Sequence, residues 1–463
     1  MKRDYNGESL EEVCSGLVPF NNLQIVASPG LIPPTPKPVN TESNNENESP
    51  NSPKKDGGRR RLSVTDVDGS DIEDLEDSRG LIAKLDIKTL LELYPQTPGP
   101  RGRQGRRFSV GSRTDHDMHR RASFCDKSIH TQGSPFDSSD HRIGFACKKG
   151  LKPVSPNQDS FLVLRIEGHI SLYGVFDGHG RQGHDVSNFV KDILPKLIVS
   201  DPAFHSGDMQ GALLNGFLKT QELIESETCN KRLDASASGT TCTLVIHKEK
   251  KLWVANVGDS RCVIAKPNGD SFQVFDACRD HKPDIPEERE RIVSMGGVVI
   301  KPPMDVNHRV YVKGFRFPGL AMSRALGDLI GYHRAGISAV PEIHEFDIDG
   351  DESLILCSDG VWEFFSSSDA VSLIDNELRA NESLHMHAAE KLCKVSWDKW
   401  IEEEKGAIVD DITAIVAHLG STGTESSESL HERPLSRVSN GSAESGGGGA
   451  ATDSRTKRHN QSS

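Results

Sequence analysis

An aspartate closes one of the most apolar stretches of this sequence. The run ISLYGVF, at 170–176, has the composition of a buried strand, and Asp177 follows it directly. Gly178 and His179 come next, with a second glycine behind them. An isolated Asp-Gly after a strand is usually a turn former. Several other strand ends of this chain also carry aspartates, and their common position indicates a chemical role.

Antiparallel pairing would bring these aspartates to one edge of a sheet. Asp159 lies just before the strand predicted at 161–166, and Asp177 lies just after its predicted partner. The start of one antiparallel strand and the end of its neighbour lie side by side, so the two carboxylates should be close. Further aspartates occupy equivalent positions beside later predicted strands: Asp259, Asp359, Asp410 and Asp411.

A cluster of carboxylates predicts a bound cation. Buried carboxylates repel one another and lose hydration, so they persist mainly where positive charge compensates them. Oxygen ligands without His or Cys favour Mg(II) or Mn(II) over zinc. Gly178 fits this interpretation, because a residue without a side chain lets its carbonyl approach an ion.

The predicted elements form an α+β sandwich in which helices cover antiparallel sheets. Short apolar runs predict strands at 161–166, 170–176, 241–247, 251–257, 261–266, 353–358 and 412–418. Tight turns at 167–169, 248–250 and 258–260 predict antiparallel hairpins. Helical periodicity or helix start signals mark 186–197, 209–225, 285–296 and 367–380.

Charge and composition narrow the class of protein. A net charge of -13 over 463 residues argues against a general nucleic-acid binder. No apolar stretch is long enough for a membrane helix. The nine cysteines form no CxxC pair, and we interpret them as thiols in a reducing compartment, the cytoplasm or the nucleus. We also expect a monomer.

The ends of the chain differ from its middle. Residues 1–140 are rich in Pro, Ser, Asn and charge and are predicted to form a disordered regulatory or targeting arm. Residues 419–463 are predicted to form a disordered tail rich in Gly and Ser. The folded body is therefore expected at 141–418.

The arm repeats one short motif three times. Ser63, Ser109 and Ser123 each follow two arginines and a spacer, in RRLS, RRFS and RRAS. This pattern is typical of substrates of basophilic kinases, and we hypothesise that phosphorylation of these serines regulates the body. A basic localisation patch is the alternative interpretation.

Five longer motifs carry a resemblance to a known family. They are YGVFDGHG, SGTTCTLVIHKEKKLWVANVGDSR, GLAMSRALGD, LILCSDGVWE and VDDITAIV, in this order. Over about 141–418 the chain resembles the metal-dependent serine/threonine protein phosphatases of type 2C, the PPM family. The resemblance implies a four-layer sandwich of two antiparallel β-sheets flanked by antiparallel α-helices, with a two-metal site at one edge.

The resemblance also implies roles for individual residues. Asp177 would bridge two Mg(II) or Mn(II) ions, the carbonyl of Gly178 would hold one of them, and Asp359 and Asp410 would complete the ligands. Asp259, together with Asp359, would hold a third, weaker ion.

The implied reaction is hydrolysis of phosphoserine or phosphothreonine in a phosphoprotein substrate. A metal-activated water would attack without a covalent intermediate, and His179 is the candidate general acid. A histidine that merely hydrogen-bonds the site is the alternative. Asp159 is expected to support the ligands from behind.

The sequence departs from the family where an arginine usually grips the substrate phosphate. Val154 stands at that position, five residues before Asp159. A lysine could bind phosphate as a point charge, and the nearby candidates are Lys148, Lys149 and Lys152, of which Lys152 is preferred. Elsewhere, His184 is interpreted as a surface residue and Arg324 as part of a buried ion pair.

Two other function classes compete with an active phosphatase. A binding module that keeps only the fold would be expected to lack metal-binding aspartates, yet Asp177, Asp259, Asp359 and Asp410 are all present. A two-metal nuclease would need a basic track for nucleic acid, which this acidic chain does not offer. A metal-dependent protein phosphatase is the leading hypothesis.

Overall fold

Two antiparallel sheets form the centre of the fold in this computed structural model, which describes residues 107–114, 127–152, 155–166, 169–269, 271–380 and 384–420. The strand order is β16-β9-β8-β5-β4-β1-β2 in the seven-stranded sheet and β11-β10-β17-β18-β3 in the five-stranded sheet. The described residues all belong to one compact unit of the chain.

The strands are mostly short and apolar. The seven-stranded sheet contains β1 (Arg107–Arg113), β2 (Ser128–Gly133), β4 (Ser160–Ile166), β5 (Ile170–Phe176), β8 (Cys242–Lys248), β9 (Lys251–Val257) and β16 (Glu342–Asp347). The five-stranded sheet contains β3 (Ile143–Lys148), β10 (Arg261–Asn268), β11 (Ser271–Asp276), β17 (Ser353–Cys357) and β18 (Ile412–His418). The central strands are buried on both faces, which explains their nearly continuous apolar runs.

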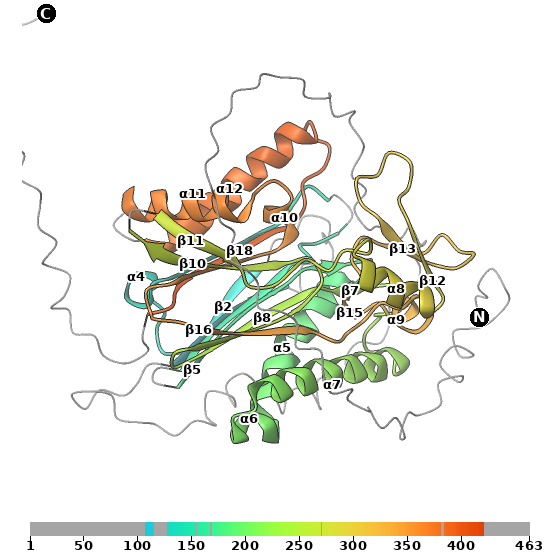
Figure 1. The fold of residues 1–463 in the computed structure, drawn as a ribbon, viewed down its shortest axis with the longest axis horizontal. Helices are drawn as coiled ribbons and strands as arrows, with labels where there is room; N and C mark the ends of the chain where they lie inside the picture. The colour runs from blue at the N-terminus through green and yellow to red at the C-terminus, as the bar shows by residue number, and fades with distance from the viewer. Residues whose placement is uncertain are drawn as a thin grey trace, which may run out of the picture. The chain divides into compact units, whose positions relative to one another are not determined.

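Helices cover the outer face of each sheet (Figure 1). Helices α5 (Gly183–Ser200) and α7 (Met209–Cys229), joined by α6 (Pro202–Ser206), cover the seven-stranded sheet, and α11 (Ser367–Ala380) and α12 (His385–Glu403) cover the five-stranded sheet. Helix α4 (Ser138–His141) and helix α10 (Asp359–Trp362) are single turns. The predicted four-layer α+β sandwich is confirmed.

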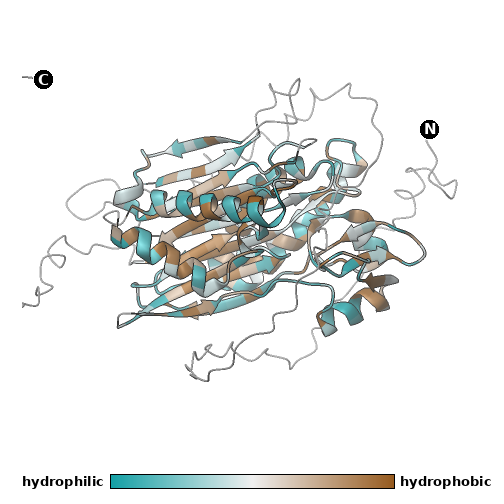
Figure 2. Cartoon of the chain, turned by 90° about the horizontal axis from the view of Figure 1, so that it is seen from above, coloured by the Kyte–Doolittle hydropathy of each residue, from teal (hydrophilic) through white to brown (hydrophobic). Residues whose placement is uncertain are grey.

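The two sheets pack directly on each other. Phe145 of β3 stacks on Phe161 of β4, with ring centroids 4.9 Å apart, and so joins one sheet to the other. Tyr173 is 1% exposed in the same cluster. Figure 2 shows apolar residues running through the strands, while the helices carry both hydrophilic and apolar faces. Burial of such side chains stabilises the fold by about 1.5–3 kcal/mol each.

One predicted hairpin is wrong. The turn at 258–260 does not return the chain to the same sheet, because β9 belongs to the seven-stranded sheet and β10 to the five-stranded sheet. Gly258 has a φ of +103°, and a Cβ there would lie 2.6 Å from the Cβ of Thr241. This glycine lets the chain cross between the sheets. The crossing places Asp259 at the edge that both sheets share.

The folded body starts before the predicted boundary at residue 141. Strand β1 pairs with both β2 and β4, and its Phe108 and Val110 are buried between the sheets. From α5, the Lys191 ammonium donates a 2.8 Å hydrogen bond to the backbone carbonyl of Ser112 in β1. Strand β1 is short and lies in a polar sequence, so its few alternating apolar residues are not enough to predict a strand. Residues 127–140 of the predicted arm are also described, and so are Leu419 and Gly420 of the predicted tail, where Leu419 is 1% exposed in the core. Residues 1–106 and 115–126 of the arm and 421–463 of the tail lie outside the described residues.

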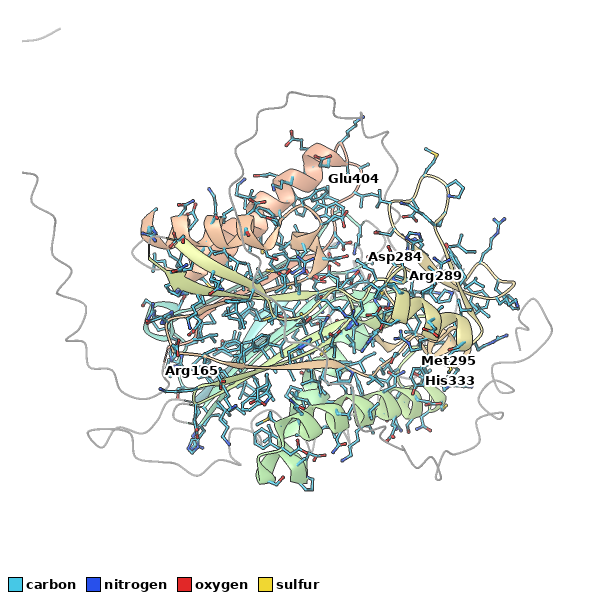
Figure 3. All side chains as sticks on the ribbon, in the orientation of Figure 1. Arg165, Asp284, Arg289, Met295, His333 and Glu404 are labelled. Carbon is cyan, nitrogen blue, oxygen red and sulfur yellow. The ribbon has the colours of Figure 1, made fainter. Side chains whose placement is uncertain are left out.

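A smaller unit flanks the sheets. It contains helices α8 (Pro286–Ser294) and α9 (Leu329–Ala335), and strands β12 (Gly297–Ile300), β13 (Arg309–Val312) and β14 (Pro318–Leu320). Asp284, Arg289, Met295 and His333 mark its position (Figure 3). Arg324 donates to Glu288, 2.6 Å away and 1% exposed, which is the predicted buried ion pair. Within the described ranges, no helix is both long and apolar enough to cross a membrane.

Candidate active site

The strand-end aspartates meet where the edges of the two sheets meet. Ser160 of β4 pairs with Phe176 of β5, so Asp159 and Asp177 stand beside each other. Cys357 of β17 pairs with Ala414 of β18, which brings Asp359 close to the start of β18 and therefore to Asp410. Asp159, Asp259 and Asp410 are at most 5% exposed, while Asp177 and Asp359 are partly buried.

A serine links the two halves of this cluster. The hydroxyl of Ser358, at the end of β17, donates a 2.8 Å hydrogen bond to Asp159 Oδ2, beside β4. The same hydroxyl accepts from the backbone N–H of Thr413 in β18. Asp159 is therefore connected through Ser358 to the five-stranded sheet, beside the predicted ligands.

Asp411 differs from the other aspartates because both of its carboxylate oxygens accept hydrogen bonds from backbone N–H groups. Its two oxygens accept hydrogen bonds of 2.7 Å and 2.9 Å from the backbone N–H groups of Gly150 and Gln158. This fully buried carboxylate holds the 150–158 loop in place, with a gap at 153–154 in the described residues. It is therefore a structural member of the cluster.

Charge repulsion dominates the centre of the cluster. Burial, followed by repulsion from Asp159, Asp359 and Asp410, raises the pKa of Asp177 well above its usual range. Burial and repulsion from Asp410 and Asp259 do the same for Asp359, and burial and Asp411 raise the pKa of Asp159 to about 6. These carboxylates lie closer together than their own charges favour.

Among the described residues, lysines form direct ion pairs with the two ends of the cluster. Lys152 forms an ion pair with Asp410 Oδ1 and lies 3.7 Å from Asp411 Oδ2. Lys282 lies 2.5 Å from Asp259 Oδ2. Burial would raise the pKa of Asp259, but attraction to Lys282 outweighs it and lowers the pKa. The central pair, Asp177 and Asp359, has no such direct ion pair with a lysine among the described residues.

The chemistry of these donors fits hard divalent cations. One carboxylate oxygen each of Asp259 and Asp359 is buried and accepts no hydrogen bond. Such oxygens, gathered in one place without sulfur or nitrogen donors, suit Mg(II) or Mn(II). In the described part of the chain no three acidic, His or Cys side chains surround one point as a closed metal cage would. The fit therefore rests on charge and donor type.

Gly178 is required by packing. A Cβ on Gly178 would lie 2.3 Å from the carbonyl oxygen of Gly183 and 2.6 Å from that of Gln158. Its backbone N–H donates to the Gln158 carbonyl at 3.2 Å. The close approach of two loops explains why glycine follows Asp177.

The two histidines of this region are both buried. His179 is 7% exposed, and its Nε2 lies 2.5 Å from Asp328 Oδ2. Burial opposes protonation of His179, but attraction to Asp328 outweighs burial and raises the pKa. The interpretation of His184 as a surface residue is wrong, since it too is 7% exposed. The first turns of α5 pack close to the sheet edge, which buries residues of both faces there.

Only one of the three lysine candidates reaches the cluster. Lys148 lies over the ring of Trp397, 4.2 Å from its centroid, and Lys149 donates to the backbone carbonyls of Gly150 and Lys152. Lys152 is the one paired with Asp410. Lys282 and Asp328 were missed by the sequence analysis, because nothing local to either residue indicates a partner that is distant in sequence.

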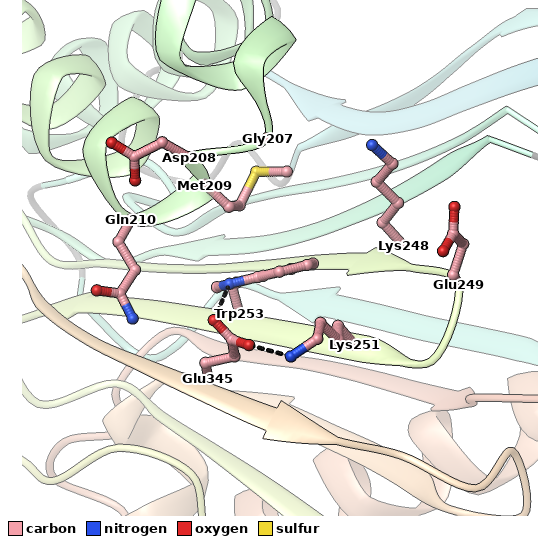
Figure 4. Close-up of a pocket in the computed structure, with 9 residues that line it drawn as sticks. All are labelled: Gly207, Asp208, Met209, Gln210, Lys248, Glu249, Lys251, Trp253 and Glu345. Carbon is pink, nitrogen blue, oxygen red and sulfur yellow. Dashed lines mark hydrogen bonds and ion pairs between the residues drawn. The ribbon is translucent and has the colours of Figure 1, made fainter.

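A separate cavity of about 350 Å³ lies away from these carboxylates (Figure 4). The loop before α7 and the turn between β8 and β9 line it, with Trp253 donating to Glu345 on one wall. None of the clustered aspartates lines this cavity. Its position separates it from the candidate site.

Comparisons with known proteins agree with the fold and the motif order. The family model described as protein phosphatase 2C matches residues 154–402. Probable protein phosphatase 2C 72 of Arabidopsis thaliana is 32% identical, and the match covers 68% of this chain and 98% of that protein. Probable protein phosphatase 2C 34 of the same plant is 30% identical, with 63% and 84% covered.

A solved structure shows the same fold at lower identity. The serine-threonine phosphatase 2C from Toxoplasma gondii superposes with a TM-score of 0.52 at 21% identity, covering 60% of this chain and 94% of that one.

Asp177→Asn is expected to stabilise the metal-free protein, increasingly so as the pH rises. The folded-state pKa of Asp177 lies above its ordinary value of 3.8. Its protonated form therefore stabilises the fold at low pH, and this contribution is lost as the pH rises through the ordinary value towards the raised one. Asparagine carries no charge at any pH. The gain in the free energy of unfolding should therefore be larger at pH 8 than at pH 4.

Urea unfolding in a metal chelator, repeated across this pH range, measures the difference. Asp347→Asn is the control, because that side chain is 87% exposed and lies outside the cluster. A variant at 177 that is less stable than the wild type at pH 8 would show that the carboxylates do not repel one another as described.

Proposed function

Because the chain belongs to the protein phosphatase 2C family, we propose that it hydrolyses phosphoserine and phosphothreonine in phosphoprotein substrates at the carboxylate cluster. The family makes the chain a protein phosphatase, a hydrolase whose relatives depend on metal ions. The observation that carries the proposal is the gathering of buried and partly buried aspartates from β4, β5, β17 and β18 at the shared sheet edge.

We assign the ligands by combining this charge with the family motifs. Asp177 would bridge two Mg(II) or Mn(II) ions, with Asp359, Asp410 and the carbonyl of Gly178 as the other protein ligands. Asp259 and Asp359 would hold a third, weaker ion. When bound, the ions supply an activated water and neutralise phosphoryl oxygens. Support comes from the oxygen-only donor set and from the unpaired oxygens of Asp259 and Asp359.

His179 would protonate the departing serine or threonine oxygen. Its neighbour Asp328 favours the protonated imidazole in a site where burial alone would disfavour it. An alkoxide is a poor leaving group, and a positioned acid typically contributes about 10²- to 10⁴-fold to such a step. Asp159 keeps the ligands in place through Ser358, which holds both sheets together behind them.

The first test is phosphate release from a phosphothreonine peptide by the full chain, with Mn(II), with Mg(II) and with chelator. Release should require the metal and should fall more than about 100-fold in Asp177→Asn, because losing even an outer partner of a metal ligand costs roughly 10- to 100-fold. Asp347→Asn should be unchanged. No release by the folded wild type with either metal would instead favour a phosphatase-like binding module.

Lys152 is proposed to bind the substrate phosphate in place of the usual arginine. Its ammonium already lies at the cluster, paired with Asp410, where a cation bound to that carboxylate would compete with it. The pKa of Lys152 is raised, because Asp410 and its neighbours outweigh the effect of burial, so the group keeps its positive charge. A charged ammonium beside the reaction centre suits a phosphate dianion.

Lys152→Met should raise the KM for a phosphopeptide roughly tenfold or more, since a hydrogen bond to a charged group is worth about 1.5–3 kcal/mol. Lys152→Arg should retain part of the affinity that Lys152→Met loses. Lys148→Met is the matched control, because that lysine rests on Trp397 instead of on the cluster. Steady-state kinetics at saturating Mn(II) measures the effect, and an unchanged KM in Lys152→Met would refute the assignment.

The three arginine-serine motifs are proposed as sites for a basophilic kinase that regulates the enzyme. Ser63 and Ser123 lie outside the described residues. Ser109 lies in β1, 3% exposed, between the buried Phe108 and Val110. A kinase needs an accessible serine, so Ser109 could be phosphorylated only when β1 leaves the sheet. Phosphate on Ser109 would then prevent β1 from returning, because burial of a dianion is costly.

A time course of phosphorylation by a cyclic-nucleotide-dependent kinase, read serine by serine by mass spectrometry, tests this model. Ser109 should react more slowly than Ser63 in the same chain. Lys191→Met removes a hydrogen bond that holds β1 without changing the motif, so it should speed up reaction at Ser109 alone. Equal rates at both serines in the wild type would show that β1 does not protect Ser109, and no phosphorylation at any of the three would refute kinase regulation.

A further inference from the structure

We propose that Asp328 is the positioning residue for His179, and that a small three-stranded sheet is built to bring the two together. The inference rests on the proposed role of His179 as general acid. The sheet consists of β6 (Gly178–His179), β7 (Gly239–Thr240) and β15 (Leu326–Gly327), in the order β15-β7-β6. It stands where β5 delivers Asp177 to the cluster.

The register of this sheet brings Asp328 near the histidine. Across β7, His179 pairs with Gly239, and Gly239 pairs on its other side with Gly327. Asp328 follows β15, so β7 lies between it and His179. Its side chain reaches back across β7, and its Oδ2 lies 2.5 Å from Nε2 of the imidazole.

Glycine at position 239 makes this reach possible. A Cβ on Gly239 would lie 2.3 Å from Asp328 Oδ2 and 2.7 Å from its Cγ. Any side chain at that position would therefore occupy the space that the carboxylate uses. The contact between Asp328 and His179 depends on a bare backbone in the strand between them.

The backbone at Asp328 is held in an unfavourable conformation. Its φ of +47° lies in the left-handed region, which non-glycine residues rarely adopt. Gln221 of α7 fixes the preceding residue from both sides, because its side chain donates to the carbonyl of Gly327 and accepts from the N–H of Gly327. The backbone N–H of Asp328 donates to Ser238 at 2.8 Å. These hydrogen bonds hold the backbone of Asp328 in its left-handed conformation.

The side chain of Asp328 does not cap the helix that follows it. It precedes α9 as the N-cap residue, a position where aspartate usually accepts a hydrogen bond from the first turn of the helix. No such bond is made by the Asp328 side chain. The Asp328 carboxylate is 1% exposed. It contacts His179 and does not cap α9.

This contact fixes the ring of His179. With Nε2 bound to Asp328, the other ring nitrogen, Nδ1, is buried and has no hydrogen-bond partner within the described residues. Orientation of one imidazole nitrogen by a carboxylate leaves the other nitrogen to exchange a proton with a substrate oxygen. Asp328 would act through His179 and would not touch the substrate itself.

Two substrates separate positioning of an acid from a structural role. Loss of a threonine oxygen from a phosphothreonine peptide needs a proton, whereas 4-nitrophenolate leaves 4-nitrophenyl phosphate without one. In the full chain with Mn(II), Asp328→Asn should lower kcat for the phosphopeptide roughly 10- to 100-fold and change kcat for 4-nitrophenyl phosphate by less than about threefold. Asparagine tolerates the left-handed backbone.

Two further variants make the test decisive. Asp328→Gly suits the positive φ, so it should fold and show the same substrate-selective loss. In a His179→Asn background, Asp328→Asn should cause no additional loss, because Asp328 acts only through that ring. Parallel losses on both substrates, or additive losses in the double variant, would overturn the inference while leaving the phosphatase intact. A wild type without metal-dependent activity on either substrate would overturn the proposed function itself.

Discussion

Repulsion among carboxylates at the shared edge of two sheets is the constraint on which the rest of this structure depends. Asp177 and Asp359 are brought together by strands from different sheets, and burial makes their charges costly. A packed core between the sheets, with Phe145 stacked on Phe161, fixes the strands that carry them. The packing of the core therefore holds these carboxylates close together against their mutual repulsion. Bound cations would reduce this repulsion.

The groups around the aspartate cluster connect the sheets, compensate charge and position His179. Ser358 ties Asp159 to the second sheet, and Lys152 and Lys282 compensate the outer carboxylates. The small sheet β15-β7-β6 carries His179 to the same edge. Ser358 and Asp159, like Lys152 and Asp410, come from segments that are distant in sequence. The candidate site is therefore a property of the whole sandwich, and of none of its segments alone.

Local patterns were sufficient to predict the parts that depend on neighbouring strands. The hairpin of β4 and β5 could be predicted from two apolar runs and a short turn, and with it the meeting of Asp159 and Asp177. Long-range pairing left weaker signals. The turn before Asp259 resembles a hairpin, yet the chain crosses there to the other sheet. Strand β1, helix α12 and the partners Lys282 and Asp328 were missed, because their roles depend on contacts made only in the folded chain.

Calorimetric titration of the metal-free chain with Mn(II), in two buffers of different ionisation enthalpy at about pH 6, tests the central claim most directly. The account predicts that two or more ions bind and that protons are released, because Asp177 and Asp359, whose pKa values are raised by burial and by neighbouring carboxylates, must give up protons to accept a cation. Binding without proton release, or no binding at all, would contradict the view that these carboxylates are held together for metal.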